Sequence, residues 1–355
     1  MHRPLIAACA AMACAGSAFA QSSVTLSGIV DVAARRGEGE GAGKLTSLVS
    51  GSNSTSRLVF SGREDLGGGL GAGFHLESGL LADSGANASA QKFFDRRSTV
   101  SLSSATWGEL RLGRDFVPSY VVWSRHDPFA YVGVARTANL VSASPAGPIR
   151  AAFGTNANTT VRSDNEVQYI LPAGLGGFEG AIALAPREDA DVTTGNATLA
   201  GVRVGYTGQG FAVSAATTRS DNTQTTASRF HDSVAGAQVD LANVKLSAAW
   251  RQFKYDQAKQ TLALLGAAAT WGPHEVKASW VRANMSGSVA GTAIGANDAD
   301  QIGIGYVYHL SKRTAAYTTY ARISNDGAAR FLVDGPAPVA GGTSKGFVVG
   351  IRHRF

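Results

Sequence analysis

The sequence predicts an all-β fold, namely a 16-stranded antiparallel transmembrane β-barrel with a long constriction loop folded into its lumen. Three observations lead to this prediction. Sixteen short segments alternate apolar and polar residues with a period of two. Their connections alternate between short turns and longer polar segments. One stretch, roughly residues 116–158, has no period of two and is far longer than an ordinary loop. Inside a closed sheet, such a stretch would narrow the enclosed space.

The N-terminus predicts a secretory signal peptide. Arg3 supplies the positive start, an apolar core follows, and residues 18–20 form an Ala-Phe-Ala cleavage motif. Cys14 raises the alternative of a lipoprotein signal, but the residues before it lack the expected leucine. The apolar run is too short for a transmembrane anchor. We therefore expect residues 1–20 to be a signal peptide and residues 21–355 to form one barrel domain.

Composition excludes several classes of protein. Charged residues make up 16% of the chain, against ~25% in typical soluble domains. Both cysteines lie in the predicted signal, so the mature chain has no disulfide, zinc-thiolate site or thiol nucleophile. Loss of the signal lowers the formal charge from +6 to +5, which is too small and too dispersed for nucleic-acid binding. No mature segment is long and apolar enough for a transmembrane helix.

The segments favour strands over helices. β-branched and aromatic residues dominate them, glycines lie inside them, and the apolar period is two rather than 3.6. In one segment Phe74 and Leu76 share a face, and His75 and Glu77 share the other, as a wall between lipid and water requires. The predicted strands are Val24–Ala34, Arg57–Leu66, Leu70–Leu81, Phe93–Ser104, Trp107–Phe116, Asn165–Pro172, Phe178–Ala185, Ala197–Thr207, Gly210–Ser220, Asp232–Leu241, Val244–Tyr255, Thr261–Trp271, His274–Met285, Gln301–Leu310, Thr314–Ser324 and Lys345–Phe355.

The connections predict two different rims. The short turns lie near residues 67, 105, 174, 208, 242, 272 and 311, and the longer polar segments lie near residues 41, 86, 158, 191, 222, 259, 291 and 336. Short turns at one rim and long loops at the other are typical of outer-membrane barrels. The chain ends on Phe355, at the end of an alternating strand, and we expect that strand to pair with the first and close the barrel.

Aromatic residues near the predicted strand ends favour two interfacial belts. They are Trp107, Tyr206, Phe211, Trp250, Tyr255, Trp271, Trp280, Tyr308 and Tyr320. The alternative is a soluble β-sandwich with scattered aromatic residues.

The mature chain resembles the trimeric general-diffusion porins of Gram-negative outer membranes, above all the β-proteobacterial kind. The resemblance covers essentially the whole mature chain. It rests on the stretches SSVTLSGIVD, SRLVFSGREDLGGGLGAGFHLESG, FFDRRSTVSLSSATWGELRLGRDF, the DPF of the long loop, RSDNEVQY and GFVVGIRHRF. It implies an outer-membrane location among lipid and lipopolysaccharide, a homotrimer, passive diffusion of ions and small hydrophilic solutes, no cofactor and no enzymatic activity.

The resemblance also implies a ladder of arginines on the wall that faces acids on the constriction loop. Arg57, Arg96 and Arg162 match the basic wall by position. The family's loop usually supplies two carboxylates, whereas here only Asp127 is well placed, with Asp115 at the loop root. Arg125, His126 and Arg136 lie in the same loop, which weakens any transfer of cation preference.

Charge counting predicts a basic constriction. The positive set is Arg57, Arg96, Arg114, Arg125 and Arg162, and the negative set is Asp115 and Asp127. Rings of arginine or lysine favour anions, so we expect anion preference. The alternative is that some of these arginines face away or pair with acids such as Glu64, Asp65, Asp95 and Glu166. The facing of Arg96 and Arg97 stays open, because a slip of one residue exchanges the two faces of a strand.

Other motifs indicate little chemistry. GGGLGAG resembles a phosphate-binding loop, but it joins two strands with no following helix, which favours a hairpin turn. No metal-ligand spacing or nucleophile elbow is present in the sequence, so we expect neither a metal site nor catalytic residues. The competing functions are a substrate-specific channel for small anionic solutes, an outer-membrane barrel enzyme and a non-channel adhesin. Saturable conductance, hydrolysis and lack of conductance, respectively, would distinguish them.

Overall fold

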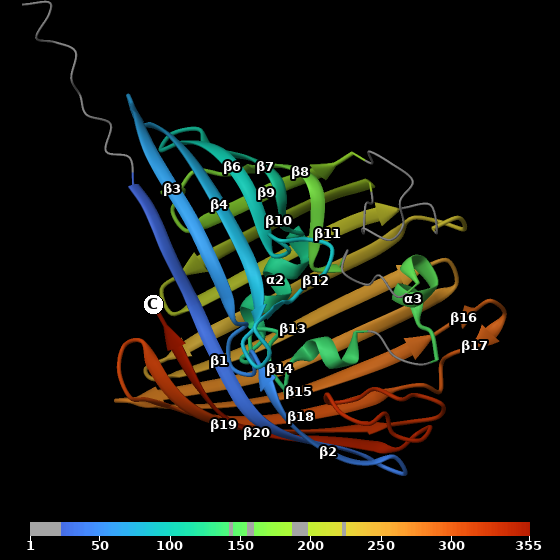
Figure 1. The fold of residues 1–355 in the computed structure, drawn as a ribbon. Coiled ribbons are helices and arrows are strands. Elements are labelled where there is room, and N and C mark those ends of the chain that lie inside the picture. The colour runs from blue at the N-terminus through green and yellow to red at the C-terminus, as the bar shows by residue number, and fades with distance from the viewer. Residues whose placement is uncertain (1–22, 142–144, 155–159, 187–197, 222–224) are drawn as a thin grey trace, which may run out of the picture.

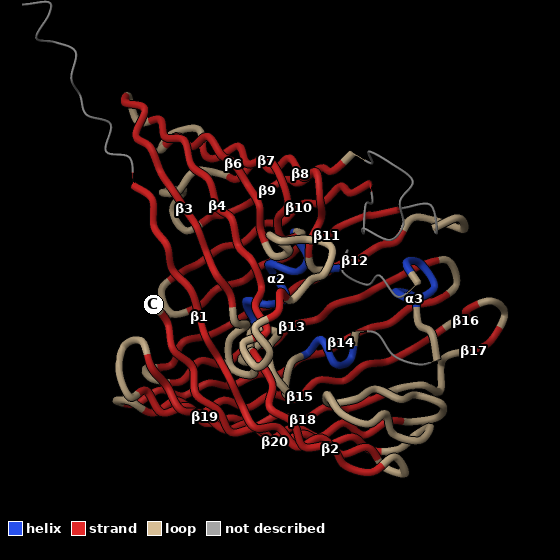
Figure 2. The backbone as a smooth tube through the Cα atoms, viewed as in Figure 1, coloured by secondary structure: helices blue, strands red, loops and turns tan. Residues whose placement is uncertain are grey.

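The computed structural model describes residues 23–141, 145–154, 160–186, 198–221 and 225–355. These residues form one antiparallel sheet that closes into a barrel, with the helices of one long connection inside it (Figures 1 and 2). The predicted signal peptide, residues 1–20, lies outside the described residues.

Sixteen strands build the wall. The main sheet contains eighteen, of which β5 has only two residues and β2 pairs with one half of β1. The wall strands are β1 (Ser23–Gly39), β3 (Arg57–Gly67), β4 (Leu70–Leu81), β6 (Arg97–Ser104), β7 (Gly108–Phe116), β8 (Arg162–Ile170), β9 (Phe178–Ala185), β10 (Thr198–Gly208), β11 (Phe211–Asp221), β12 (Phe230–Leu241), β13 (Val244–Tyr255), β14 (Ala258–Trp271), β15 (His274–Ser286), β18 (Ala299–His309), β19 (Thr314–Asn325) and β20 (Thr343–Arg354). The predicted fold class is therefore confirmed.

The barrel closes between its first and last strands. β1 and β20 are antiparallel neighbours in a register that pairs Ile29 with Arg354. Gly28 and Phe355 exchange two backbone hydrogen bonds of 3.1 Å, which seals the end of the seam. Along β20, Val349 is exposed on the outer wall while Val348 is fully buried, as the alternation predicts.

The remaining elements lie in connections. β2 (Gly43–Ser50) pairs with residues 32–39 of β1, the half of β1 that β3 does not reach. β5 (Ala86–Asn87) pairs with the end of β4, and β16 (Ser288–Val289) pairs with β17 (Thr292–Ala293). The long connection between β7 and β8 contains α2 (Pro118–His126), η1 (Thr137–Leu140) and α3 (Pro148–Phe153). No helix in the described part of the chain is both long enough and apolar enough to cross a membrane.

Two local predictions were wrong. The longer polar segment expected near residue 259 is a tight turn, because Asp256 adopts a positive φ of 50° that suits a hairpin and Lys259 already pairs with Lys254. Tyr255 does not belong to an aromatic belt. It is buried, because it shares the inward face of β13 with Phe253 and Arg251.

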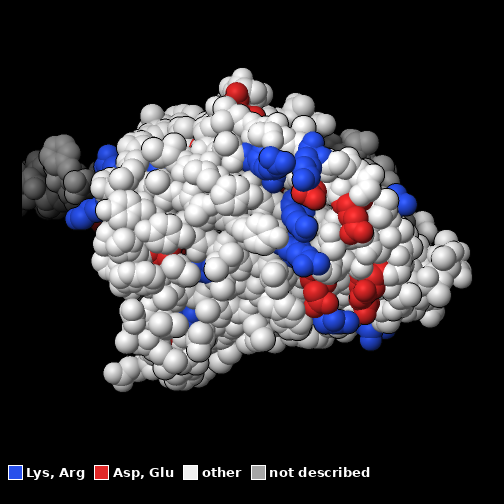
Figure 3. Space-filling view, turned by 90° about the horizontal axis from the view of Figure 1, so that it is seen from below, with Lys and Arg blue, Asp and Glu red and all other residues white. Residues whose placement is uncertain are grey.

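The outer wall is a broad apolar band. Large apolar side chains on it are exposed, and several aromatic residues lie near strand ends, among them Trp107 and Trp271. Seen from below, a wide uncharged surface ends at a stripe of lysine and arginine side chains with carboxylates beside it (Figure 3). An apolar band bordered by polar residues is the surface that a bilayer requires.

Candidate pore constriction

The long connection between β7 and β8 folds into the lumen. Its helices lie within the ring of strands (Figures 1 and 2). Trp123 and Phe153 from this connection are fully buried and belong to the main hydrophobic cluster, together with inward residues of β12–β15 and β18–β20. The core of the barrel is therefore formed by the loop and one half of the wall. The opposite half of the wall remains available to line a channel.

Helix α2 forms where the local sequence sets both of its ends. Pro118 occupies the first turn, where its fixed φ suits a helix and its missing N–H is not needed. Asp127 precedes Pro128 and is extended, with ψ at 115°, because the residue before a proline avoids the helical region. The buried residues of the helix, among them Ser119, Val122, Trp123 and His126, are spaced three or four positions apart and therefore lie on one face, which packs on the wall.

Polar contacts fix α2 to the wall. The Ser119 hydroxyl donates to Asp232 Oδ2 at 2.6 Å, and the same carboxylate pairs with Arg251 at 2.7 Å. Arg251 is fully buried, and its guanidinium carbon lies 5.9 Å from the centre of the Trp123 ring. A buried charge is tolerated when it is paired and hydrogen-bonded, so this cluster holds the helix in one position.

The C-terminal end of α2 packs closely on the wall. His126 Nε2 lies 2.9 Å from Ser214 Oγ, and Ser247 donates to the His126 carbonyl at 2.7 Å. Gly236 makes the approach possible, since a Cβ there would overlap the His126 ring. Burial, together with the charges of Arg125 and Lys245, lowers the pKa of His126 to about 4. The docked imidazole is therefore neutral at pH 7.

Asp127 organises the loop from within. Its carboxylate accepts hydrogen bonds from Phe129 N at 2.9 Å, Tyr131 N at 3.0 Å and the Thr137 hydroxyl at 2.8 Å. The side chain is buried, and this burial raises its pKa. The structure places Asp127 behind the loop surface and not in the channel, which differs from the role expected for it as the acid of the constriction.

A second segment, residues 51–56, also turns into the lumen, and this position was not predicted from the sequence. Asp31 on β1 holds this segment by accepting backbone hydrogen bonds from Asn53 at 2.9 Å and Ser54 at 2.6 Å. Tyr317 donates to the same carboxylate. The Ser/Asn-rich composition of residues 51–56, which is typical of turns, was the available sequence signal for this segment.

A cavity of about 650 Å³, called the eyelet below, lies between the wall and both folded-in segments. The wall contributes Arg57, Glu77, Arg96 and Arg162. The loop contributes Tyr120, Val121, Ser124, Arg125, Ala130, Tyr131 and Val132, and the second segment contributes Asn53, Ser54 and Thr55, with Phe116 and Val161 completing the lining. On α2 the eyelet residues occupy the face opposite Val122 and Trp123, so the helix separates core from channel.

The charges of the eyelet are strongly unequal. Four guanidinium groups line it, and Glu77 is the one carboxylate among the described lining residues. Arg96 Nε donates to Glu77 Oε1 at 2.5 Å, and Arg57 Nε lies 3.4 Å from the same oxygen. Arg162 forms no ion pair with any residue that the structure describes, and its guanidinium carbon stacks 4.6 Å from the centre of the Phe116 ring. Arg162 therefore contributes positive charge to the eyelet without a described ion-pair partner.

The structure brings Arg57, Arg96 and Arg162 together as the resemblance implied. Glu77 was placed on the inward face of its strand by the alternation but was not identified as an eyelet residue. The available signal was the order of the predicted strands. The strand that carries Glu77 is followed by the one that contains Arg96 and Arg97, and consecutive strands of such a barrel are neighbours.

The other predicted residues lie elsewhere. Arg114 is not an eyelet residue, because it donates to the Asp95 carbonyl and to Asp164 Oδ1, both at 2.7 Å. Asp115 is buried and pairs with Arg111 at 2.8 Å and with Arg97 at 3.3 Å.

Arg125 lines the eyelet from the loop side and reaches across to Glu179 on β9, with which it forms an ion pair. Arg203 lies 3.8 Å from the same carboxylate. The Arg125–Glu179 ion pair thus connects the loop to the wall at one end of the eyelet. Two arginines again share one acid, as Arg57 and Arg96 share Glu77.

Comparisons with known proteins agree with this geometry. A family model described as Gram-negative porin matches residues 7–328. Outer membrane porin protein 32 of Delftia acidovorans is 35% identical, with 100% of both chains covered. An outer membrane porin of Bordetella pertussis is 28% identical over the full length of both chains.

Solved structures lead to the same conclusion. An anion-selective porin from Comamonas acidovorans has a TM-score of 0.78 and 32% identity, and the match covers 94% of this chain and 100% of that one. OmpT of Vibrio cholerae, at 13% identity and a TM-score of 0.65, shares the fold, with 94% of this chain and 98% of that one covered. With sixteen strands, a loop inside the lumen and an eyelet between them, the chain belongs to the Gram-negative porin family and is a non-enzymatic porin of the outer membrane.

Proposed function

We propose that this porin is a diffusion channel for ions and small hydrophilic solutes that prefers anions. The observation that carries the proposal is the eyelet lining, with four arginines against Glu77. Opposed fixed charges in a narrow passage with low-dielectric walls set up a strong local field, and an excess of arginine lowers the energy of an anion inside it. The similarity to a protein described as an anion-selective porin supports the same direction.

Single-channel recording in a planar bilayer under a potassium chloride gradient tests the proposal. The reversal potential is expected to have the sign of chloride permeation. Neutralising Arg162, as R162Q, is expected to lower the anion/cation permeability ratio, because this arginine has no described acid to offset it. The matched control is R322Q, which removes the same charge from the outer face of β19. A wild-type reversal potential of the opposite sign would overturn the proposal.

The same recordings separate general diffusion from a substrate-specific channel for small anionic solutes. Conductance that rises in proportion to salt supports general diffusion, because no binding site limits the flux. Conductance that saturates with one anion and not with others would support the specific channel, because a binding site must both fill and empty during transport.

We further propose that the protein is a homotrimer and that residues 1–20 are removed on export. The family match and the full-length alignments to outer membrane porins support both. Three equal conductance steps per insertion and a mature N-terminus at Gln21, read by N-terminal sequencing, are the expected results. Single steps together with a monomer mass in detergent would exclude the trimer.

A further inference from the structure

A row of basic residues crosses four neighbouring strands on the outer wall. Arg219 on β11 pairs with His231 on β12, His231 pairs with Lys254 on β13, and Lys254 pairs with Lys259 on β14. Paired residues of adjacent antiparallel strands have Cα atoms about 4.5–5.5 Å apart. Like charges at that spacing destabilise a sheet. Within the described ranges, no ion pair includes Arg219, Lys254 or Lys259, so a counter-charge from outside the chain would stabilise this row.

From this basic row towards the middle of the wall, the polarity of the outward residues changes in the same way on all four strands. Next comes a polar row, Thr217, Ser233, Gln252 and Thr261, whose members are in register, with Thr217 and Ser233 hydroxyls 3.1 Å apart. The following row is Ala215, Ala235, Trp250 and Ala263, and the one after it is Val213, Ala237, Ala248 and Leu265. The wall therefore passes from cationic to polar to apolar over a few residues.

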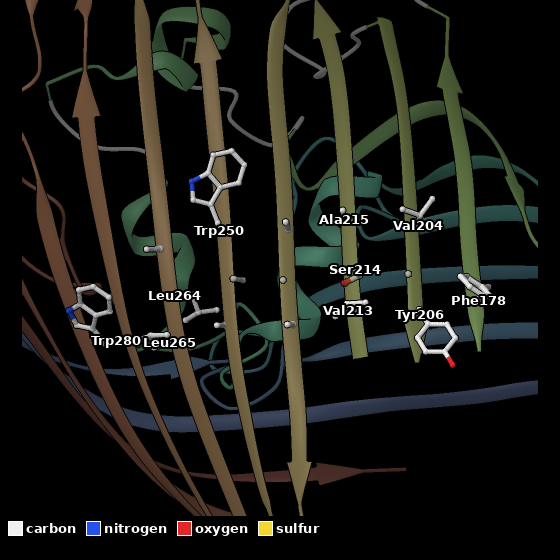
Figure 4. Close-up of a pocket in the computed structure, with 17 residues that line it drawn as sticks. Phe178, Val204, Tyr206, Val213, Ser214, Ala215, Trp250, Leu264, Leu265 and Trp280 are labelled. Atoms are coloured by element: carbon white, nitrogen blue, oxygen red, sulfur yellow. The ribbon is translucent and has the colours of Figure 1, made fainter. Parts of the chain in front are cut away.

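Two hollows lie along this gradient. A pocket of about 410 Å³ is lined by Ser228, Arg229, His231, Ser233, Gln252, Lys254 and Asp256. An apolar groove of about 800 Å³ lies closer to the middle of the wall, with small side chains in its floor and Trp250, Trp280, Tyr206 and Phe178 around it (Figure 4). Trp250 borders the groove four residues from Lys254 along β13, which is about 13 Å in a strand.

The pocket lies at the rim of the longer connections. β11 begins after the short turn at residues 208–210 and ends at Asp221, and the short turn at residues 242–243 lies at the opposite end of β12 and β13 from Lys254. In outer-membrane barrels short turns face the periplasm and longer loops face the exterior. The basic row therefore lies at the level of the outer-leaflet headgroups, and the groove at the level of its acyl chains.

We propose that the outer wall of β11–β14 holds one phosphorylated glycolipid of the outer leaflet. The phosphate lies against Lys254, Lys259 and Arg219, the sugar hydroxyls meet the polar row, and an acyl chain fills the apolar groove. The order of the three chemistries along the wall matches the order of phosphate, sugar and acyl chain in such a lipid. Basic clusters beside an apolar membrane surface attract anionic headgroups.

The adjoining part of the wall, which begins at β15, provides a contrast. Its basic stripe has carboxylates beside it (Figure 3). Arg282 pairs with Asp300 at 2.8 Å, and Lys44 pairs with Glu38 at 3.4 Å. Arg282 and Lys44 are thus paired within the chain, whereas Asp256 is the one acid among the described residues that line the pocket on β11–β14. A lipid phosphate is therefore expected to bind the row on β11–β14 more strongly than it binds Arg282 or Lys44.

Native mass spectrometry of the detergent-solubilised porin tests the proposal, with lipid A that carries two phosphates as the probe and its fully dephosphorylated form for comparison. The variant K254Q/K259Q removes two charges from the row. The control K312Q/R313Q removes two charges from an exposed turn at the other rim. A third variant, A237F, fills the groove without a change in charge. Conductance in a bilayer establishes that each variant is folded.

The wild type and the control are expected to retain the bisphosphorylated lipid equally, and K254Q/K259Q to bind it about thirtyfold more weakly. A237F should weaken the binding of both lipid forms, because both have acyl chains. Equal retention by K254Q/K259Q and the control, or equal binding of both lipid forms by the wild type, would overturn the phosphate site. Unchanged binding by A237F would overturn the assignment of the groove to an acyl chain.

Discussion

Arg96 and Glu77 form a short charge-assisted hydrogen bond on the wall of the eyelet, with Arg96 Nε 2.5 Å from Glu77 Oε1. Arg57 approaches the same oxygen from the neighbouring strand at 3.4 Å. One carboxylate thus partly offsets two guanidinium groups, while a third, on Arg162, has no ion-pair partner among the described residues. The balance of these four groups decides the field that a permeating ion meets.

Replacing Glu77 by glutamine should raise the anion/cation permeability ratio, because Arg57 and Arg96 would lose the charge that offsets them. The change should be at least about twofold, since a unit charge about 8 Å away contributes ~0.5 kcal/mol even in water. Reversal potentials under a salt gradient measure it. R96Q should shift the ratio in the opposite direction, and a shift of the same sign in both variants would contradict the charge balance.

Arg96 and Arg97 are predicted to differ in their effect on selectivity. Arg96 lines the eyelet, whereas Arg97 pairs with Asp115 at 3.3 Å outside the eyelet lining. R96E should therefore lower the anion/cation permeability ratio more than R97E does. The two variants carry the same charge change one residue apart, so each serves as the control for the other. Equal effects in bilayer recordings would contradict the assignment of Arg96 to the eyelet.

Acid is predicted to weaken the docking of the constriction loop through His126. The folded state lowers the pKa of His126 from 6.5 to about 4, so its contribution to stability is fully present above pH 6.5 and is lost as the pH falls towards about 4. Open-channel noise should rise over that range. H126Q should flatten the dependence, because glutamine keeps a polar partner for Ser214 and does not titrate.

The control for this prediction is H309Q, which removes a histidine that lies 3.3 Å from Glu275 and outside the constriction loop. Its pH dependence should follow the wild type. If H126Q and the wild type show the same increase in noise with acid, another group controls the docking of the loop.

Asp127 should be needed for the order of the loop and not for selectivity. D127A leaves the buried N–H groups of Phe129 and Tyr131 without an acceptor, and each unsatisfied group costs about 1–3 kcal/mol. Faster limited proteolysis within the loop and noisier currents are the expected results. D127N keeps one acceptor oxygen and should have a smaller effect. A large change in reversal potential with quiet currents would instead place the carboxylate in the channel.

Gly236 is predicted to set the position of α2. A Cβ at this position would overlap the His126 ring, so G236V should push the helix from the wall towards the eyelet and lower the single-channel conductance. A235V, one position away on the outer face of β12, is the matched control and should conduct as the wild type does. Full conductance in G236V would mean that the helix can shift without narrowing the passage.

The period of two in the sequence was enough to predict the barrel and most of its strands. The predicted strands with the best agreement match the structure at both ends, namely Leu70–Leu81, Phe178–Ala185 and Val244–Tyr255. Each strand has one face to the lipid and one to the interior, so apolar and polar residues alternate along its sequence. The long stretch after Phe116 was equally visible, since nothing in it alternates.

The positions within the constriction could not be read in the same way. Asp127 looks like a channel acid in the sequence, but it is the hydrogen-bond acceptor at the centre of its own loop. Arg114 looks like a wall arginine, but it is tied to Asp164. Asp31 has no special context in the sequence, yet it holds a second segment in the lumen. These roles depend on contacts between residues that are distant along the chain.

The sequence by itself therefore determined the closed sheet, the membrane-facing band and an excess of arginine near one loop, because local alternation and composition follow from the solvent that each strand face meets. Only the tertiary structure decided which arginines share a carboxylate, which acid is withdrawn from the channel and which cations of the outer wall have no ion-pair partner among the described residues. Electrostatic interactions depend on distance and on exposure to water, and both are fixed only when the strands are in register and the loop is docked.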